Sequence, residues 1–332
     1  MKKFPLFLFL PLVFFINHSW GAEKWNVLEP GNNIHVIAPG YGNHDGSVEH
    51  ARKAILKMGY EPLIPDDLIN PHPLGYSNTE EYRAAHLKEA LCDETKIVWA
   101  LRGGRGSSLL LPSLQDIPLS TPAKLIVGFS DITALHLWAA ARNWPSLHGI
   151  VLGYNKEANH AVNAEASLNE ILPILTGEIQ ELTYKFLPLN KAAQQEGRFV
   201  RGPIVGGNVS LIQRSIGTET QLNTSRKILF LEETGEQATK LMESLNHMER
   251  SRLLDSLQAV IWGNFNYAPE EHTKYQWLRE ALAEKLEERN IPFIHSDEFG
   301  HGKKNHPLPF NTPAILSFLN TEEASLTVKT NN

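Results

Sequence analysis

Cysteine is almost absent from this sequence. Cys92 is the only cysteine among 332 residues, which excludes a disulfide within the chain. It lies in a helical pattern, where a lone thiol usually behaves as a small apolar side chain. We therefore expect Cys92 to be buried.

An excess of basic residues is also missing. The chain has 31 Lys and Arg residues against 37 Asp and Glu residues, a formal net charge of −6 at pH 7. This balance does not favour nucleic acid or an anionic membrane surface as a partner. The composition, 42% hydrophobic and 20% charged, is typical of a globular protein, and the length allows two domains.

The apolar run near the N-terminus is too short to cross a membrane. Two lysines precede this run, which covers 5–16. Ser19 and Gly21 are small residues at the positions that a signal peptidase reads. We therefore predict a secretory signal peptide over 1–21, with an uncleaved anchor as the alternative. The mature protein would then be soluble and either periplasmic or secreted.

Strand-like and helix-like segments alternate up to about residue 150. The strand-like runs cover 33–39, 59–64, 96–101 and 124–128, and helical patterns cover 48–58 and 80–92. Such alternation predicts a parallel sheet with helices on both faces, which binds ligands beyond the carboxyl ends of its strands. The pattern loosens after about residue 158 and becomes regular again near residue 200. We predict an N-terminal α/β domain over 22–160, an interdomain region over 161–199 and a C-terminal domain over 200–332.

Two glycine-rich turns follow strands in the N-terminal part. The turn over 40–46 is nearly a G-x-G-x-x-G dinucleotide fingerprint, but Asp45 occupies the place of the third glycine. Such turns also serve ordinary strand–helix connections, so both interpretations stay open. The turn over 102–108 lacks the lysine of a phosphate-binding P-loop. Its glycines would either let the backbone approach a ligand or form a flexible turn.

A serine stands where the strand over 124–128 meets the next helical pattern. Gly128-Phe129-Ser130 supplies the first half of G-x-S-x-G, the sharp turn on which α/β hydrolases expose a nucleophile. Ile132 stands in place of the second glycine. The first amides of the helix would point at an anion beside the hydroxyl. Serine is also a preferred helix N-cap, which is the simpler interpretation of this stretch alone.

Two later positions could complete a catalytic triad. Glu232 follows the strand-like run over 227–231, where a carboxylate could orient a histidine or merely form an acidic cap for the next helix. His301, one of 14 histidines, lies between two glycines in a predicted loop. The order Ser, Glu, His is that of α/β hydrolases, although order alone does not establish a triad.

Six short motifs, in the correct order, resemble those of the LD-carboxypeptidases. They are Ile37-Ala38-Pro39, Arg102-Gly103-Gly104-Arg105-Gly106, Gly128-Phe129-Ser130-Asp131-Ile132-Thr133-Ala134, Gly206-Gly207-Asn208 with Leu211, Leu231-Glu232-Glu233 with Glu236, and Phe299-Gly300-His301 with Leu308-Pro309. They extend over nearly the whole mature chain. The chain thus resembles this family of serine peptidases, which trim murein tetrapeptides and include the microcin C immunity peptidases.

The resemblance implies a catalytic mechanism. Ser130 would be the nucleophile, His301 the general base, and Glu232 the carboxylate that orients His301. The oxyanion would bind the backbone amide of Asp131 together with one from the loop at Gly104. No metal or cofactor is expected.

The resemblance also implies a fold and a substrate. The fold would be α/β, with a parallel-sheet nucleophile domain followed by a smaller mixed α/β domain, the active site between them, and a homodimer overall. The enzyme would remove the terminal D-alanine from L-Ala-D-Glu-meso-diaminopimelyl-D-Ala. Arg102 and Arg105 are candidates for binding the terminal carboxylate, since a guanidinium matches a carboxylate fork, and Asn208 is a further candidate for substrate binding.

Several positions depart from the family pattern. Arg105 replaces a tyrosine, Ile150 and Pro307 replace a proline and a threonine, and Asn311 replaces a glycine. A signal peptide is also unexpected, because the family's murein-recycling enzymes act in the cytoplasm. Two alternatives therefore stay open, namely an amidase that cleaves peptidyl-nucleotide antibiotics and an exported protein that binds peptides without cleaving them.

Overall fold

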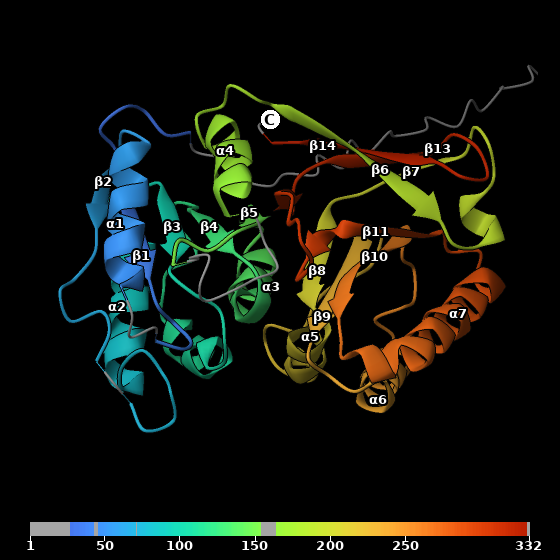
Figure 1. Cartoon of the computed structure of the whole chain (residues 1–332), viewed down its shortest axis with the longest axis horizontal. Helices are drawn as coiled ribbons and strands as arrows, with labels where there is room; N and C mark the ends of the chain where they lie inside the picture. Colours follow the sequence, from blue (N-terminus) through green and yellow to red (C-terminus); the bar gives the residue numbers. More distant parts are fainter. Residues whose placement is uncertain (1–26, 43–45, 71, 154–163, 331–332) are drawn as a thin grey trace, which may run out of the picture.

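The computed structural model describes residues 27–42, 46–70, 72–153 and 164–330. The predicted signal peptide over 1–21 lies outside these residues. Two α/β parts lie side by side, one built on a six-stranded sheet and the other on an eight-stranded sheet (Figure 1). In the described part of the chain, no helix is long and apolar enough to cross a membrane.

The first sheet has the strand order β12-β5-β4-β3-β1-β2. Its parallel strands are β1 (Asn33–Ile37), β2 (Glu61–Leu63), β3 (Ile97–Ala100), β4 (Leu125–Gly128) and β5 (Ser146–His148). The helices of this part are α1 (Ser47–Lys57), α2 (Glu80–Cys92), α3 (Thr133–Ala141) and α4 (Ala164–Leu175), and two 3₁₀ turns are η1 (Ser107–Leu114) and η2 (Ser130–Ile132). Every residue of β3 and β4 is buried, as expected for central strands covered on both faces. The predicted parallel α/β arrangement is confirmed.

The helix α2 has the predicted bounds, and its buried face includes two polar side chains. They are Arg83 and His86. Burial is possible because the Arg83 guanidinium donates to backbone carbonyls and His86 pairs with a histidine of β1. Cys92 is exposed, so the prediction of a buried thiol is wrong. It lies at the end of α2, off the side that carries the buried residues.

The second sheet has the order β7-β13-β14-β6-β11-β10-β9-β8. Its parallel strands are β8 (Ile204–Asn208), β9 (Ile228–Thr234), β10 (Ala259–Asn266) and β11 (Phe293–Gly300). Their helices are α5 (Val209–Ser215), α6 (Ala238–Arg250) and α7 (His272–Glu288), with the short turns η3 (Lys191–Ala193) and η4 (Pro269–Glu271). The antiparallel strands are β6 (Glu181–Pro188), β7 (Phe199–Arg201), β13 (Ala314–Phe318) and β14 (Ala324–Lys329). This part is therefore a mixed α/β structure, as predicted.

The two parts share elements and side chains. After β11 the chain returns to the first sheet, where β12 (Leu308–Phe310) pairs antiparallel with β5. Leu137 of α3 belongs to the apolar core of the second part, and Leu211 of α5 belongs to the core of the first. In the stretch predicted to connect the domains, α4 packs on the first core while β6 pairs within the second sheet.

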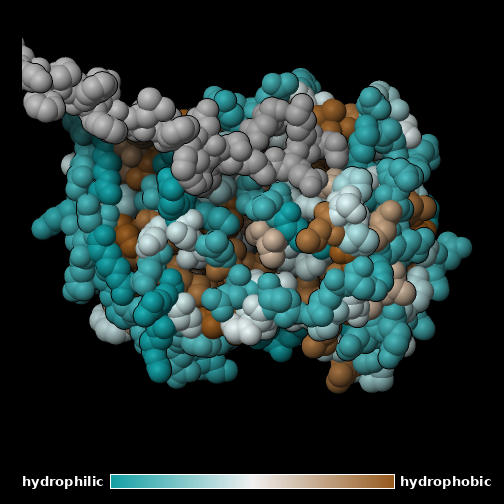
Figure 2. Space-filling view, turned by 180° about the vertical axis from the view of Figure 1, so that it is seen from behind, coloured by the Kyte–Doolittle hydropathy of each residue, from teal (hydrophilic) through white to brown (hydrophobic). Residues whose placement is uncertain are grey.

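Hydrophilic residues cover most of the face in Figure 2, and hydrophobic residues form small separate patches there. This distribution is that of an ordinary protein surface, on which single apolar residues need no explanation.

Candidate active site

Ser130 sits on a sharp turn at the carboxyl end of β4. Its φ angle is 63°, a left-handed value that costs a non-glycine residue about 1–3 kcal/mol and that often occurs at functional sites. Gly128, two residues earlier, has φ 157°, and a Cβ there would lie 2.8 Å from Cγ1 of Ile132. Ile132 is fully buried against this glycine. The turn therefore has the sharp geometry of a nucleophile elbow, with a packed isoleucine in the place of the second glycine.

The simpler interpretation of Ser130, as a helix cap, does not fit the structure. Ser130 lies inside the 3₁₀ turn η2, whose N-cap is Phe129, and no side chain caps this turn. The N-cap position of α3 belongs to Ile132, again without a side-chain cap. The Ser130 hydroxyl instead faces His301.

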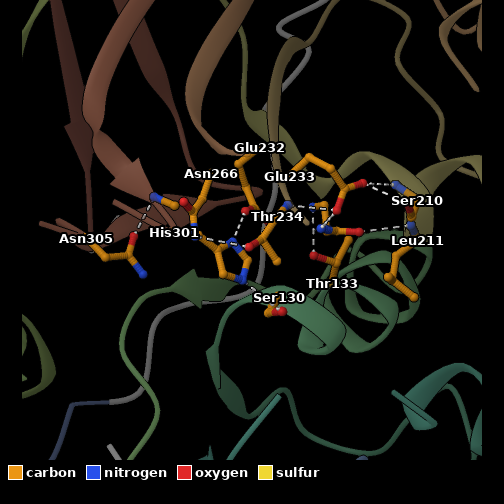
Figure 3. A network of polar contacts seen from close by, with 12 residues as sticks. Ser130, Thr133, Ser210, Leu211, Glu232, Glu233, Thr234, Asn266, His301 and Asn305 are labelled. Carbon is orange, nitrogen blue, oxygen red and sulfur yellow. Dashed lines mark hydrogen bonds and ion pairs between the residues drawn. The ribbon is translucent and has the colours of Figure 1, made fainter. Parts of the chain in front are cut away.

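Ser130, His301 and Glu232 meet across the boundary between the two parts (Figure 3). His301 follows β11 directly, and its Nε2 lies 3.1 Å from the Ser130 Oγ. Its Nδ1 is hydrogen-bonded to Oε2 of Glu232, which lies within β9. With Nδ1–H donating to the carboxylate, Nε2 is left to accept the serine proton, and this is the tautomer that a general base needs.

The surroundings of His301 set its charge. Burial lowers the pKa of His301, but the charge and hydrogen bond of Glu232, helped by the charge of Glu233, outweigh burial and raise the pKa above 6.5. Glu232 is 0% exposed. Among the described residues its Oε1 has no hydrogen-bond partner. The Nδ1–H group of His301 is therefore the main partner of this buried carboxylate.

A glycine loop passes next to the Ser130 hydroxyl. A Cβ on Gly103 would lie 3.0 Å from the Ser130 Cβ and 3.3 Å from its Oγ, and a Cβ on Gly104 would lie 2.6 Å from Cγ of Tyr41. Glycine at both positions allows the loop to pass between the tyrosine ring and the serine. Within the described residues, the amides of Gly104 and Asp131 donate to no backbone carbonyl. Asp131 follows Ser130 directly and Gly104 follows Gly103, so their amides are the candidates for the two donors that an oxyanion hole requires.

The Asp131 side chain fastens this loop to the elbow. Its Oδ2 accepts hydrogen bonds from the Ser107 amide at 2.9 Å and from the Ser107 hydroxyl at 2.6 Å. Burial raises the pKa of Asp131, while the Ser107 bonds act in the opposite direction. From the other side, Arg83 donates to the carbonyl of Pro39 at 2.5 Å and to that of Gly106 at 3.4 Å. Sequence analysis missed Ser107 and Arg83, because their partners lie on other elements and no sequence pattern marks them.

Comparison with known proteins finds one family model for each of the two parts of the chain. Residues 34–149 match the family model for the LD-carboxypeptidase N-terminal domain, and residues 201–316 match that for the LD-carboxypeptidase C-terminal domain. A relative from Rickettsia prowazekii is 32% identical over 253 residues, covering 75% of this chain and 77% of the relative. The murein tetrapeptide carboxypeptidase of Pseudomonas aeruginosa is 30% identical over 249 residues, covering 72% and 78%.

The chain belongs to the LD-carboxypeptidase family. It is accordingly a carboxypeptidase of the serine type. The microcin C7 self-immunity protein of Escherichia coli is a more distant relative, 23% identical over 281 residues that cover 73% of this chain and 79% of that protein. The crystal structure of muramoyltetrapeptide carboxypeptidase from Oxalobacter formigenes shares the fold, with a TM-score of 0.74 and 24% identity over 90% of this chain and 99% of that one.

The predicted substrate-binding residues of this LD-carboxypeptidase fall into two groups. Arg102 is half-buried and Arg105 is exposed, and both lie on the glycine loop beside Ser130. Asn208 is buried, its Nδ2 donates to Glu233 Oε1 at 2.6 Å, and its Oδ1 accepts from the amide of Leu211 at 3.3 Å. Both polar groups of the Asn208 side chain are therefore used within the protein.

The first glycine-rich turn of this LD-carboxypeptidase packs against the loop. A Cβ on Gly40 would lie 2.6 Å from Asp131 Oδ2 and 2.7 Å from the carbonyl oxygen of Gly103, so the absence of a side chain permits close packing. Residues 43–45 of the predicted fingerprint lie outside the described residues. In the part of the chain that the structure describes, no three His, Cys, Asp or Glu side chains are grouped to hold a metal ion.

Proposed function

We propose that this enzyme removes the terminal D-alanine from murein tetrapeptide, using Ser130, His301 and Glu232. The observation that carries the proposal is the contact of His301 with both Ser130 and Glu232. The choice of substrate is supported by the similarity to the murein tetrapeptide carboxypeptidase of Pseudomonas aeruginosa, which is 30% identical to this chain.

The proposed mechanism uses this arrangement of the three side chains. Ser130 Oγ attacks the carbonyl carbon of the bond to the D-residue while its proton passes to His301 Nε2. Glu232 stabilises the imidazolium, and the amides of Gly104 and Asp131 bind the oxyanion, each donor being worth about 100- to 1000-fold in rate. His301 then protonates the leaving amine of D-alanine. A water molecule, deprotonated by His301, hydrolyses the acyl-serine and restores the enzyme.

A carboxypeptidase must also recognise the terminal carboxylate of its substrate. Arg105 is the candidate that we favour, because it is exposed on the loop that carries Gly103 and Gly104 next to Ser130. Arg105→Ala should raise KM at least about tenfold with a smaller effect on kcat, since a charge-assisted pair contributes roughly 1.5–3 kcal/mol. Arg105→Lys keeps the positive charge but loses the two-pronged guanidinium, so its KM should lie between that of the wild type and that of Arg105→Ala. An unchanged KM in Arg105→Ala would remove this assignment.

The enzyme is further proposed to be exported, because of the predicted signal peptide over 1–21. Its substrate would then be a stem peptide attached to the cell wall or shed from it. Expression of the full chain in a Gram-negative host tests this. A periplasmic product that begins at Ala22 is expected, and a cytoplasmic product that retains Met1 would exclude export.

The experiment for the main proposal is mass spectrometry of murein tetrapeptide incubated with the mature enzyme and, in parallel, with Ser130→Ala. Loss of one D-alanine with the first and none with the second is expected. The second candidate is an amidase for peptidyl-nucleotide antibiotics, favoured by similarity to the microcin C7 self-immunity protein. A peptidyl sulfamoyl adenosine in the same assay separates the two functions. Tight peptide binding without turnover would instead indicate a binding protein.

A further inference from the structure

Glu233, the neighbour of the triad carboxylate, faces the opposite side of β9. Successive side chains of a strand point to opposite faces, so Glu232 faces His301 while Glu233 faces the start of α5. There Glu233 Oε2 accepts from the amide of Ser210 at 2.9 Å and from its hydroxyl at 2.7 Å, and Oε1 accepts from Asn208 Nδ2 at 2.6 Å. Glu233 thereby fixes the junction of β8 and α5 relative to the strand that carries Glu232.

The same junction is fastened to the nucleophile helix. The backbone amide of Asn208 donates to Thr133 Oγ1 at 2.9 Å. Thr133 is the first residue of α3, fully buried, and follows Ser130 by three positions. A Cβ on Gly207 would lie 2.4 Å from Thr133 Oγ1, so the glycine is what allows this contact. The hydrogen bond therefore joins the elbow of the first part to the sheet of the second.

We propose that Glu233, Asn208 and Thr133 form a coupling network that holds Ser130 at the correct distance from His301 and Glu232. Each end of the network lies within three residues of a triad member: Glu233 follows Glu232 on β9, and Thr133 begins the helix that comes directly after the turn of Ser130 (Figure 3). Thr133 and Glu233 are thus positioning residues and do not touch the substrate. The inference rests on the proposed serine mechanism and deepens it.

The reason that such a network matters is geometric. The 3.1 Å contact between Ser130 and His301 crosses from one part of the molecule to the other, so a shift between the parts changes it directly. A displacement of about 1 Å at a reacting group can cost on the order of 100-fold in rate. A buried hydrogen bond 2.9 Å long, close to the elbow, restrains this shift more tightly than apolar packing alone.

Three threonine variants test the network. Thr133→Val keeps the side-chain shape but leaves the Asn208 amide without its acceptor, and Thr133→Ser keeps the acceptor. Thr312→Val is the matched control, because Thr312 is also buried and its hydroxyl has no partner within the described residues. Each variant is treated with a fluorophosphonate, from which Ser130 Oγ displaces fluoride while the serine proton passes to His301. The rate constant of labelling, the final fraction labelled and kcat with tetrapeptide are measured.

We expect complete final labelling of Thr133→Val, with a labelling rate and a kcat that both fall at least about tenfold. Thr133→Ser should retain most of both rates, and Thr312→Val should match the wild type. Glu233→Gln should slow labelling as well, and in combination with Thr133→Val its effect should be less than multiplicative, because both residues act through one network.

Two results would overturn the inference. In one, Thr133→Val shows only a lower final fraction labelled, with a normal rate for the labelled molecules, which would indicate lost stability instead of lost positioning. In the other, wild-type enzyme does not react with the fluorophosphonate at all, which would overturn the serine mechanism and the network together. If the wild type is labelled but does not cleave tetrapeptide, only the substrate assignment fails, and the labelling rates still decide the network.

Discussion

In the proposed mechanism His301 must be neutral to accept the serine proton, yet its surroundings favour the charged form. Burial opposes the charge, but the Glu232 carboxylate prevails and the pKa of His301 lies above 6.5. Activity that depends on neutral His301 is therefore lost as the pH falls through this raised pKa. We expect the acid limb of the kcat/KM profile, which reports ionisations of the free enzyme, to have its midpoint above pH 6.5.

Replacing the carboxylate tests the cause of this shift. In Glu232→Gln the group that raises the pKa of His301 is gone while burial remains, so the acid limb should move to lower pH. The value of kcat should fall by about 10⁴-fold, as it does when the acid of a triad is replaced. Glu243→Gln, an exposed change of the same kind on α6, is the control. An acid limb that stays in place in Glu232→Gln would show that another group sets the profile.

At the scale of elements, the elbow depends on one packed side chain. Ile132 is fully buried against Gly128, so replacing it with the glycine of the usual motif should destabilise the folded protein. Ile132→Gly removes a buried aliphatic side chain and adds backbone freedom, and we expect a loss of about 3–5 kcal/mol of unfolding free energy. Ile132→Val should cost only about 0.5–1.5 kcal/mol. Urea denaturation measures both, and equal stability of Ile132→Gly and the wild type would contradict this account of the elbow.

Most elements could be predicted from their hydrophobic patterns, but their polar faces could not. The strand β9 was predicted to end at residue 231 and continues to Thr234, because buried Glu232 and Glu233 are compensated by partners that are distant in the sequence. Arg83 in α2 was overlooked for the same reason, since its carbonyl partners lie on other elements. A periodic pattern records apolar burial and contains no information on such pairing.

At the scale of the whole molecule, the active site depends on how the chain crosses between its two parts. His301 lies where the chain leaves β11 and returns to the first sheet as β12, which pairs with β5. The motifs indicated which residues would meet, but three-residue β12 and its pairing were not recognisable from the sequence. Short strands have too few alternating positions to produce a pattern. The return of the chain nevertheless connects the loop that bears His301 to the sheet that bears Ser130.

The last prediction concerns His306, which lies in the crossing segment between β11 and β12 (residues 301–307) and forms ion pairs with two carboxylates outside it. His306 Nδ1 lies 2.5 Å from Oε2 of Glu170 on α4, and its Nε2 lies 3.4 Å from Oε2 of Glu298 on β11. The hydrogen bond with Glu170 raises the pKa of His306 against the effect of burial, the charges of both carboxylates act in the same direction, and Lys304 opposes them. Because the folded pKa is raised, the stabilising contribution is complete below the unfolded value of about 6.5 and is lost as the pH rises through the folded pKa.

His306→Gln should therefore lower Tm more at acid than at alkaline pH. The difference should be modest, on the order of 1 kcal/mol, because the carboxylates are partly exposed and solvent screens the pair. His50→Gln on α1, where the histidine is exposed, is the control and should lower Tm little at either pH. Thermal unfolding at both pH values measures the effect. An equal loss for His306→Gln at both would mean that His306 stabilises the crossing segment by packing, as a neutral ring against Tyr184 and Phe299, and not by its charge.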